Sequence, residues 1–557
     1  MTAPADTGAH TGVDPVTFEV VRGNLGAICE EMKAVIQRAS FSPLLSLSAD
    51  LSCALADAAG QVVAQGNDIP VHLGAMPLGI AGMLAAYPPE GWRPGDAVLM
   101  NDPYRGGNHL PDMTLMTPVF ADATLIGFAV SRVHWPDVGG PVPGSSSVSD
   151  HILKEGLRVP PIRIARDDVL DAQLVDLIVS NMRMRMRSHR LGDLQAQCAG
   201  NRRGGERLAR LAGRYGAQTL RAVMRATLDH SEAIVSARIA TLPEGVWRHA
   251  ESLDGDGYTT GGDMTIRAAV SRRGDRLRFD FSGSSPCTRG PMNAPPSVTA
   301  SAAYYVTLAV FGEGAAPNAG AYRPVDVVTQ PGTLVHAVEP FPVVAANTET
   351  ATRIVDVLLG ALAQAGDFAV AGSYGCAAVY TLGGTQPDTG RPFVHYETVG
   401  GGGGAGPRAD GLDGLRVHMG NTMNLPIEAL EARLPVAFEG YALVPDSGGA
   451  GAHRGGEGVR KRFRVLADGV DFSMLLERTQ SAAAGYRGGG AGAVASVVVE
   501  RADGRRETLP SKAHVVLGRG DVVDIVTAGG GGWGVPGTAP AATSSSCGPT
   551  SPSAPDR

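Results

Sequence analysis

Several features that would assign a protein to a specialised class are missing from this chain of 557 residues. The six cysteines are scattered without a CxxC pair or regular spacing, which favours reduced thiols in a cytoplasmic protein over a disulfide framework. No run of about 18 apolar residues occurs, and the N-terminus lacks the basic and apolar regions of a signal peptide, so no membrane span is expected. The net charge of −7 disfavours nucleic acid or an anionic membrane as a partner.

Aromatic residues are also sparse, at 5%, whereas glycine (75) and proline (38) are plentiful, so many turns and loops are expected. With 43% hydrophobic residues, a chain of this length can form several domains around a large core.

The periodicity of the apolar residues changes along the chain and predicts a mixed α+β fold. Helical spacing dominates 15–40 and 166–240, a hairpin is expected at 49–64, and strands are expected between 458 and 526. We therefore expect a disordered leader (1–14), an N-terminal metal-site region with a helical segment (15–262), a mixed α/β region (263–456), a β-rich region (457–536) and a disordered tail (537–557).

A polar loop, NDPYRGGNHLPDM at residues 101–113, lies between the apolar runs GDAVLM and TLMTPVF. Runs of this kind are typical of strands, so the loop is expected at the end of a sheet. His109 and Asp112 in this loop are three residues apart, and Pro111 between them opposes a regular helix. The two side chains therefore converge from a turn.

A second His/Asp pair lies downstream in SRVHWPDVGG and contains His134 and Asp137. A short turn at 121–123 joins the two strand-like segments between the pairs, and such a hairpin returns His134 to His109 and Asp112. Two imidazoles and one or two carboxylates then lie within reach of one metal ion. From spacing alone, hydrogen-bonded loop pairs are the commoner alternative. We interpret Asp137, which precedes Val-Gly-Gly, as turn-forming or as a support for the ligands.

Two glycine-rich segments, GGGGAG at 401–406 and GGGGWG at 529–534, have neither the Lys-Ser/Thr of a P-loop nor a strand–GxGxxG–helix context. A turn or a close approach of two backbones is the favoured interpretation, and a phosphate cradle at 401–406 is the alternative. The sequence thus carries no recognisable ATP-binding motif.

The motifs NDPYRGGNHLPDMTLMTPVF, QGNDIPVHLGAMP and HWPDVGG resemble the hydantoinase B/oxoprolinase family. The resemblance continues through EGLRVPP, FDFSGSSP, NTETATRIVDVLLGAL, NTMNLPIEALE and PDSGGAGAHRGGEGVR to the final GGGGWGVP, and covers roughly residues 14–536.

The resemblance implies a metal site built from an aspartate, a His-x-x-Asp pair and a later histidine. Carried over to this sequence, these residues are Asp50 in SADLSCAL, His109, Asp112 and His134. The last three would be the catalytic residues. This ligand set suits zinc, manganese or iron without choosing among them.

The resemblance also implies a division of labour. An A-type subunit would bind ATP and phosphorylate the amide oxygen of a hydantoin, lactam or 5-oxoproline, and this chain would supply metal-activated water to hydrolyse it. The expected assembly contains two copies of each subunit. Two alternatives remain open: a subunit of an ATP-dependent acetone- or acetophenone-type carboxylase, and a scaffold that has lost its reaction.

Four further residues are candidates for substrate contact under this resemblance: His72, Arg105, Asp137 and Glu349. His72 in PVHLGAMP is equally consistent with a structural histidine. Glu349, at the expected start of a helix, is also explained by the helix dipole.

Overall fold

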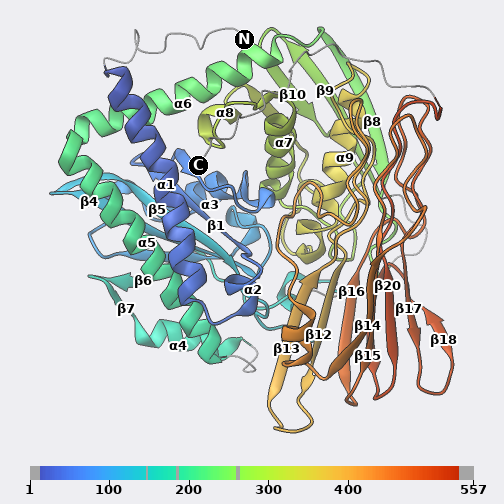
Figure 1. Cartoon of the computed structure of the whole chain (residues 1–557). Helices are drawn as coiled ribbons and strands as arrows, with labels where there is room; N and C mark the ends of the chain where they lie inside the picture. Colours follow the sequence, from blue (N-terminus) through green and yellow to red (C-terminus); the bar gives the residue numbers. More distant parts are fainter. Residues whose placement is uncertain (1–12, 146–147, 183–186, 259–263, 538–557) are drawn as a thin grey trace, which may run out of the picture.

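The structure is a computed structural model that describes residues 13–145, 148–182, 187–258 and 264–537. It has a mixed α+β fold, as predicted, in which an N-terminal sheet with its helices lies beside a central sheet and two C-terminal sheets (Figure 1). The predicted leader and tail fall almost entirely outside the described residues.

The N-terminal sheet has seven strands in the order β2-β1-β5-β4-β3-β6-β7. Its strands are β1 (Leu51–Asp57), β2 (Val62–Gln65), β3 (Ala97–Met100), β4 (Asp112–Ala121), β5 (Thr124–His134), β6 (Ile162–Arg166) and β7 (Val169–Leu170). The predicted hairpins at 49–64 and 112–134 are both present as antiparallel pairs.

Apolar residues fill both faces of this sheet because helices cover both. Successive residues of a strand point to opposite faces. In β1, Leu55 belongs to the core under the helices α1 (Pro15–Ala39) and α5 (Arg187–Tyr215), whereas Ala54 belongs to the core under α3 (Ala75–Ala86). The strands therefore read as continuous apolar runs.

Helix α1 begins where the sequence predicts it. The Asp14 side chain accepts hydrogen bonds from the backbone N–H groups of Val16 and Thr17, and Pro15 occupies the first turn. One face of the helix, including Leu25 and Met32, is buried against α5 and the sheet. The other helices of the N-terminal part are α2 (Pro43–Ser46), α4 (Ala172–Asn181) and α6 (Ala217–Ile239).

The central sheet has the order β11-β10-β9-β8 and packs against two helices. Its elements are β8 (Gly245–Ser252), β9 (Thr265–Arg273), β10 (Arg276–Asp280), β11 (Val325–Val328), α7 (Pro296–Phe311), α8 (Ala319–Tyr322) and α9 (Thr350–Leu362). Strand β8 pairs with β9 along its length, so the predicted boundary at 262/263 falls inside a hairpin.

Two further sheets pack face to face around the third large core, with strand orders β13-β12-β16-β19 and β14-β15-β20-β17-β18. Their elements are β12 (Val379–Thr385), β13 (Pro392–Thr398), β14 (Val436–Leu443), β15 (Val459–Val465), β16 (Val470–Leu475), β17 (Ser496–Glu500), β18 (Arg506–Thr508), β19 (Lys512–Leu517), β20 (Val522–Val526) and the helix α10 (Ile427–Glu431). Strands β14 and β15 pair across the predicted boundary at 456/457.

The glycine-rich segments approach one another backbone to backbone, in agreement with the favoured interpretation. The amide of Ala405 donates to the carbonyl of Gly531, and that of Gly530 donates to Gly456. A Cβ atom at Gly530 would lie 2.0 Å from the carbonyl oxygen of Gly403, so no other residue fits there. Five amides of 401–406, all except that of Gly404, donate to protein carbonyls, which argues against the phosphate cradle.

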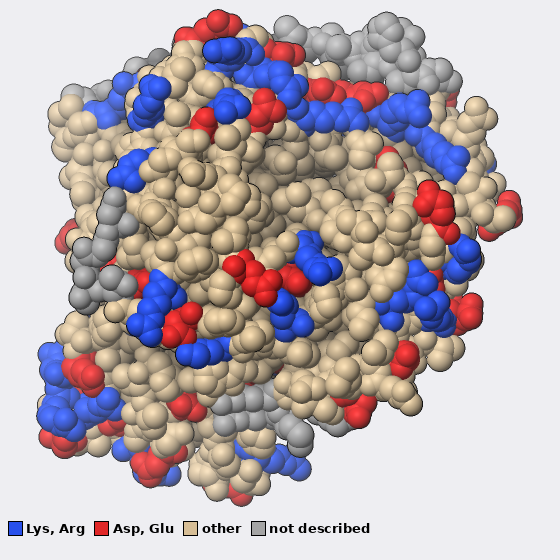
Figure 2. Space-filling view, turned by 180° about the vertical axis from the view of Figure 1, so that it is seen from behind, with Lys and Arg blue, Asp and Glu red and all other residues tan. Residues whose placement is uncertain are grey.

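Seen from behind, the surface carries lysine and arginine intermingled with aspartate and glutamate, mostly around the margin, with one further cluster of both signs near the centre of the view (Figure 2). Among the residues that the structure describes, no helix combines the length and hydropathy that a bilayer span requires. The five cysteines within these ranges are free thiols.

Candidate metal centre

Three neighbouring strands of the N-terminal sheet, β1, β5 and β4, have termini on the same side of the sheet, and these bring the predicted ligands together. Strand β5 lies between β1 and β4 and is antiparallel to both, so its end meets their beginnings. Asp112 and His134 are paired in the register of β4 with β5. The backbone N–H of His134 donates to the carbonyl of Asp50, which immediately precedes β1.

His109 reaches this edge from a tight turn rather than from a helix, as Pro111 predicts. The amide of Asp112 donates to the carbonyl of His109. Asn101 anchors the turn, because its Nδ2 donates to the carbonyl of Leu110 at 2.7 Å. The loop is therefore fixed at both ends, although it contains no regular secondary structure around His109.

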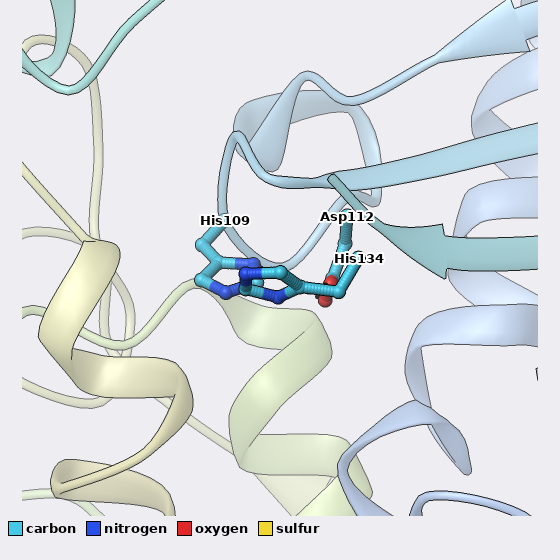
Figure 3. Close-up of side chains that lie close together, drawn as sticks. All are labelled: His109, Asp112 and His134. Atoms are coloured by element: carbon cyan, nitrogen blue, oxygen red, sulfur yellow. Dashed lines mark ion pairs between the residues drawn. The ribbon is translucent and has the colours of Figure 1, made fainter. Parts of the chain in front are cut away.

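The side chains of His109, Asp112 and His134 point toward one another (Figure 3), and all three are buried. One nitrogen or oxygen from each lies within 4.8 Å of the others. His109 Nδ1 is 3.1 Å from Asp112 Oδ2, and His134 Nδ1 is 3.5 Å from Asp112 Oδ1. Asp50 stands at the margin of this triad, with its Oδ2 3.9 Å from His134 Nδ1.

His72 lies next to Asp112 of the triad, on the 3-10 helix η2 (Pro70–His72). Its Nε2 is 3.3 Å from Asp112 Oδ2, and its Nδ1 is 2.7 Å from the hydroxyl of Ser52. An ionised carboxylate only accepts, so His72 donates its Nε2–H to Asp112, and its Nδ1 shares a hydrogen bond with the Ser52 hydroxyl. The two residues together orient the carboxylate of Asp112.

Asn347, at the end of η7 (Val344–Asn347), contacts the far side of the His109 ring, with its Nδ2 3.3 Å from His109 Nε2. Its Oδ1 has no hydrogen-bond partner. The oxygen and nitrogen of an amide are interchangeable in such an assignment. Turned over, the amide oxygen would accept from Nε2–H and leave the Nδ1 lone pair of His109 directed at Asp112.

The donor atoms of the triad fit a divalent cation. His109 Nδ1 and Asp112 Oδ1 are buried without a hydrogen-bond partner in the described parts of the chain, although a buried polar atom normally has one. Two imidazoles and a carboxylate, with Asp50 as a candidate fourth ligand, form the mixed nitrogen and oxygen set that binds zinc, manganese or iron. Such an ion would give the unpartnered atoms a partner.

The pKa values of two carboxyl groups of the site are shifted in opposite directions. Burial raises the pKa of Asp50, only partly opposed by His134. Burial would also raise the pKa of Asp112, but the neighbouring His109 and His72 outweigh it and hold that pKa well below its usual range. Asp112 is therefore ionised, as a metal ligand must be.

A narrow cavity leads to the triad. It measures about 40 Å³, which is room for about three water molecules. Its walls come from distant parts of the chain: Asp50, Ile69, Val71, His72, His134, Asn347, Thr348, Thr352, Tyr374, Cys376, Ala377, Tyr396, Thr398, Arg416, Val417, Met419, Gly420 and Thr422. The ring of Tyr396 packs on His134 with 4.5 Å between centroids and covers that ligand.

The other predicted substrate residues are not among those walls. Arg105 is exposed and lies 3.6 Å from the carboxylate of Asp102. Asp137 is buried and accepts from the amides of Gly139 and Gly144, as expected of a turn-forming residue. Glu349 is fully buried immediately before α9, beside Thr348 and Cys376 of the cavity wall, and burial raises its pKa to about 8.

The sequence did not single out Ser52, Asn347, Tyr396 or Arg416. Ser52 lies two residues after Asp50 in a quoted motif, and Asn347 opens the motif NTETATR, so both were within reach of the resemblance. Tyr396 and Arg416 lie more than 250 residues from His134, in segments that carry no local signal. They reach the site because β13 and the loop before α10 lie against loops of the N-terminal part, where the amide of Met423 donates to the carbonyl of Ser48.

A sequence model of the hydantoinase B/oxoprolinase family matches residues 14–536. An uncharacterised protein of Methanocaldococcus jannaschii is 34% identical over 94% of this chain and 91% of its own length. The beta chain of the caprolactamase of Pseudomonas jessenii is 31% identical over 95% of this chain and 92% of its own length. The 5-oxoprolinase 1 of Arabidopsis thaliana is 32% identical over 94% of this chain, which spans only 42% of that longer protein.

Solved structures agree with these similarities. The crystal structure of the ATP-dependent caprolactamase from Pseudomonas jessenii matches with a TM-score of 0.87 and 29% identity, over 94% of this chain and 91% of that chain. A nucleotide-free acetone carboxylase structure matches with a TM-score of 0.84 over 94% of this chain and 76% of its own, but at 18% identity it supports the fold alone. The chain belongs to the hydantoinase B/oxoprolinase family.

Proposed function

We propose that this chain is the hydrolytic subunit of an ATP-dependent cyclic amide hydrolase. The observation that carries the proposal is the buried triad of His109, Asp112 and His134 at the end of a narrow cavity. Relatives of at least 30% identity are named caprolactamase and 5-oxoprolinase, and both names denote enzymes that open cyclic amides. The substrate class is therefore a lactam, a hydantoin or 5-oxoproline.

The residues of the triad would hold a divalent metal, with Asp50 as the fourth ligand. When bound, such an ion lowers the pKa of a coordinated water to about 7 and makes hydroxide available at neutral pH. His72 and Ser52 fix the orientation of Asp112, and Asn347 fixes the ring of His109. The Tyr396 ring shields His134 from bulk water.

An amide is a poor electrophile, so hydroxide at this site needs an activated substrate. We infer that an A-type partner protein binds ATP and phosphorylates the amide oxygen, which converts that oxygen into a leaving group. Water then adds to the former carbonyl carbon, the ring C–N bond breaks as the nitrogen takes up a proton, and a second water hydrolyses the resulting acyl phosphate. One ATP and two waters are therefore consumed for each ring opened. Support comes from hydantoinase and caprolactamase relatives whose names make each of them one component of a multi-subunit enzyme, and from the absence of a P-loop motif in this sequence.

A component of an ATP-dependent carboxylase is the second candidate. The fold shared with acetone carboxylase favours it, but fold kinship alone does not determine a reaction. Carboxylase chemistry would form a carbon–carbon bond and leave cyclic amides intact.

Reconstitution distinguishes the two functions. The purified chain, its A-type partner and ATP would be incubated with a panel of lactams, hydantoins and 5-oxoproline, and in parallel with bicarbonate and a ketone. We expect ring opening only when both proteins and ATP are present, and neither ATP binding nor turnover by this chain alone. Carboxylation of the ketone without ring opening would replace the hydrolase assignment with the carboxylase one.

A further inference from the structure

Among the residues that the structure describes, Arg416 is the one lysine or arginine that lines the cavity. It is half-buried, on the loop that precedes α10. No carboxylate of the described residues lies within the 4 Å that defines an ion pair with its guanidinium, in a chain where most buried arginines have such a partner. Its charge is therefore not compensated by an ion pair with a described carboxylate.

The carboxylates that could neutralise Arg416 are engaged elsewhere. Glu397, on the neighbouring strand β13, accepts from Lys461 Nζ at 2.6 Å, and although burial opposes it, this ion pair brings the pKa of Glu397 to about 2. Asp413, on the same loop as Arg416, is paired with Arg454 at 2.8 Å. Asp50 lies beside His134, at the end of the cavity that holds the triad.

The guanidinium of Arg416 is held in a fixed position. Its Nε donates to the Thr398 hydroxyl at 2.5 Å, its Nη1 donates to the Thr422 carbonyl at 2.6 Å, and its Nη2 donates to the Thr398 carbonyl. Of the five N–H donors of an arginine, two remain after these three bonds. A pre-organised fork with two free donors matches the geometry of an oxyanion.

Arg416 and His134 line the same cavity. Thr398, which holds Arg416, and Tyr396, which covers His134, are two residues apart on β13 and share a face of the strand. Two residues of a strand span roughly 7 Å. A ligand with a reacting carbon at the triad can therefore place an anionic group on Arg416.

We propose that Arg416 is the anion-binding residue of this cavity and takes an oxyanion of the ligand. This proposal rests on the proposed function and deepens it, because the activated amide carries a phosphoryl group and some cyclic amides carry a carboxylate. Arg416 would hold that group while the carbon to be attacked lies beside His134. Its side chain thereby contributes to the choice of substrate.

Binding of simple anions to the purified chain tests this proposal without any turnover, so a failed amidase assay would not affect it. Inorganic phosphate and acetate would each be titrated into wild type, Arg416→Gln, Arg416→Lys and the matched control Arg391→Gln, which changes an exposed arginine. The same titrations in the His109→Ala background separate binding at Arg416 from binding at the triad.

We expect Arg416→Gln to weaken binding roughly tenfold to a hundredfold, as for a lost charge-assisted hydrogen bond, while Arg391→Gln leaves it unchanged. Dependence on Arg416 for phosphate points to the phosphoryl group, and dependence for acetate points to a substrate carboxylate. If Arg416→Gln fails to fold, Arg416→Lys decides, with binding reduced several-fold. Wild-type affinity for both anions in the folded Arg416 variant would overturn the proposal.

Discussion

Asp112 and His134 face each other across β4 and β5, with His134 Nδ1 3.5 Å from Asp112 Oδ1 at the open end of the hairpin. The register of ten residue pairs along these strands fixes this distance, whereas a loop alone would not. Functional side chains on rigid strands keep their geometry when one of them is replaced. Each single substitution is therefore expected to have its own distinct effect.

Replacing His109 by alanine should remove most of the bound metal and leave the fold intact. The imidazole is a donor of the triad but lies in a turn, so its loss takes little from the core. Elemental analysis after purification, together with thermal melting, measures both effects. His395→Ala is the matched control, because His395 is also buried but contacts Glu397, away from the triad. Full metal content in His109→Ala would refute the ligand assignment.

Replacing His72 by leucine should weaken metal binding without abolishing it. His72 holds Asp112 Oδ2 through its Nε2 but is not one of the donors grouped with the triad. Loss of such a supporting hydrogen bond typically costs about 10- to 100-fold in metal affinity. Competition with a chelator of known affinity gives the constant. Ser52→Ala should weaken metal binding less than His72→Leu, because Ser52 acts on Asp112 through His72. A larger loss of metal affinity from Ser52→Ala would contradict this.

Two buried glutamates should respond to pH in opposite ways. Burial raises the pKa of Glu349 from 4.5 to about 8. Since its folded-state pKa exceeds the unfolded value, Glu349 lowers the free energy of unfolding as pH rises from about 4.5 to about 8. Glu349→Gln, which stays neutral, should therefore become progressively more stable than wild type over this range. Urea unfolding at pH 5, 6.5 and 8 measures the trend.

Glu397 supplies the contrast for Glu349, because Lys461 and His395 outweigh its burial and bring its pKa down to about 2. Its stabilising effect is present above pH 4.5 and is lost as pH falls toward 2. Glu397→Gln leaves Lys461 buried without its partner and should cost about 3–5 kcal/mol at neutral pH. Equal pH trends in the two variants would contradict the assignment of charge.

The packed glycine segments should tolerate no side chain. A Cβ at Gly530 would lie 2.0 Å from a carbonyl oxygen, so Gly530→Ala must separate two backbones and should cost at least about 3 kcal/mol, or prevent folding. Gly440→Ala is the control, since Gly440 is exposed on β14 and has no atom within 4 Å of the added carbon. It should change the free energy of unfolding by less than about 0.5 kcal/mol. Similar stability of both variants would show that the contacts are not rigid.

Local patterns in the sequence predicted the part of the site that one hairpin builds. The alternation of apolar runs and turns around 112–134 is enough to bring His134 to Asp112, because strand pairing follows from adjacency in sequence. The strands from 459 to 526 were predicted from the same kind of signal. The metal interpretation itself rested on the family resemblance, since spacing alone favoured a simple loop pair.

Contacts between distant segments could not be predicted in this way. Tyr396 and Arg416 reach the cavity only because β13 and the loop before α10 contact loops of the N-terminal part. The residues that flank Tyr396 and Arg416 in the sequence do not indicate whether these two side chains face the cavity or the solvent. The partners of the two glycine-rich segments were likewise unpredictable, because a glycine shows that a close approach is possible but not which backbone approaches.

We infer that this chain performs the attack by water and that its partner performs the activation by ATP. Asp112→Asn, mixed with the wild-type A-type partner, tests it most directly when phosphate release and ring opening are followed in the same sample. The substitution removes a charged ligand of the triad, whereas phosphorylation of the amide by the partner does not require that ligand. We predict that ring opening stops while ATP consumption continues at a reduced rate. Ring opening at the wild-type rate would contradict the account.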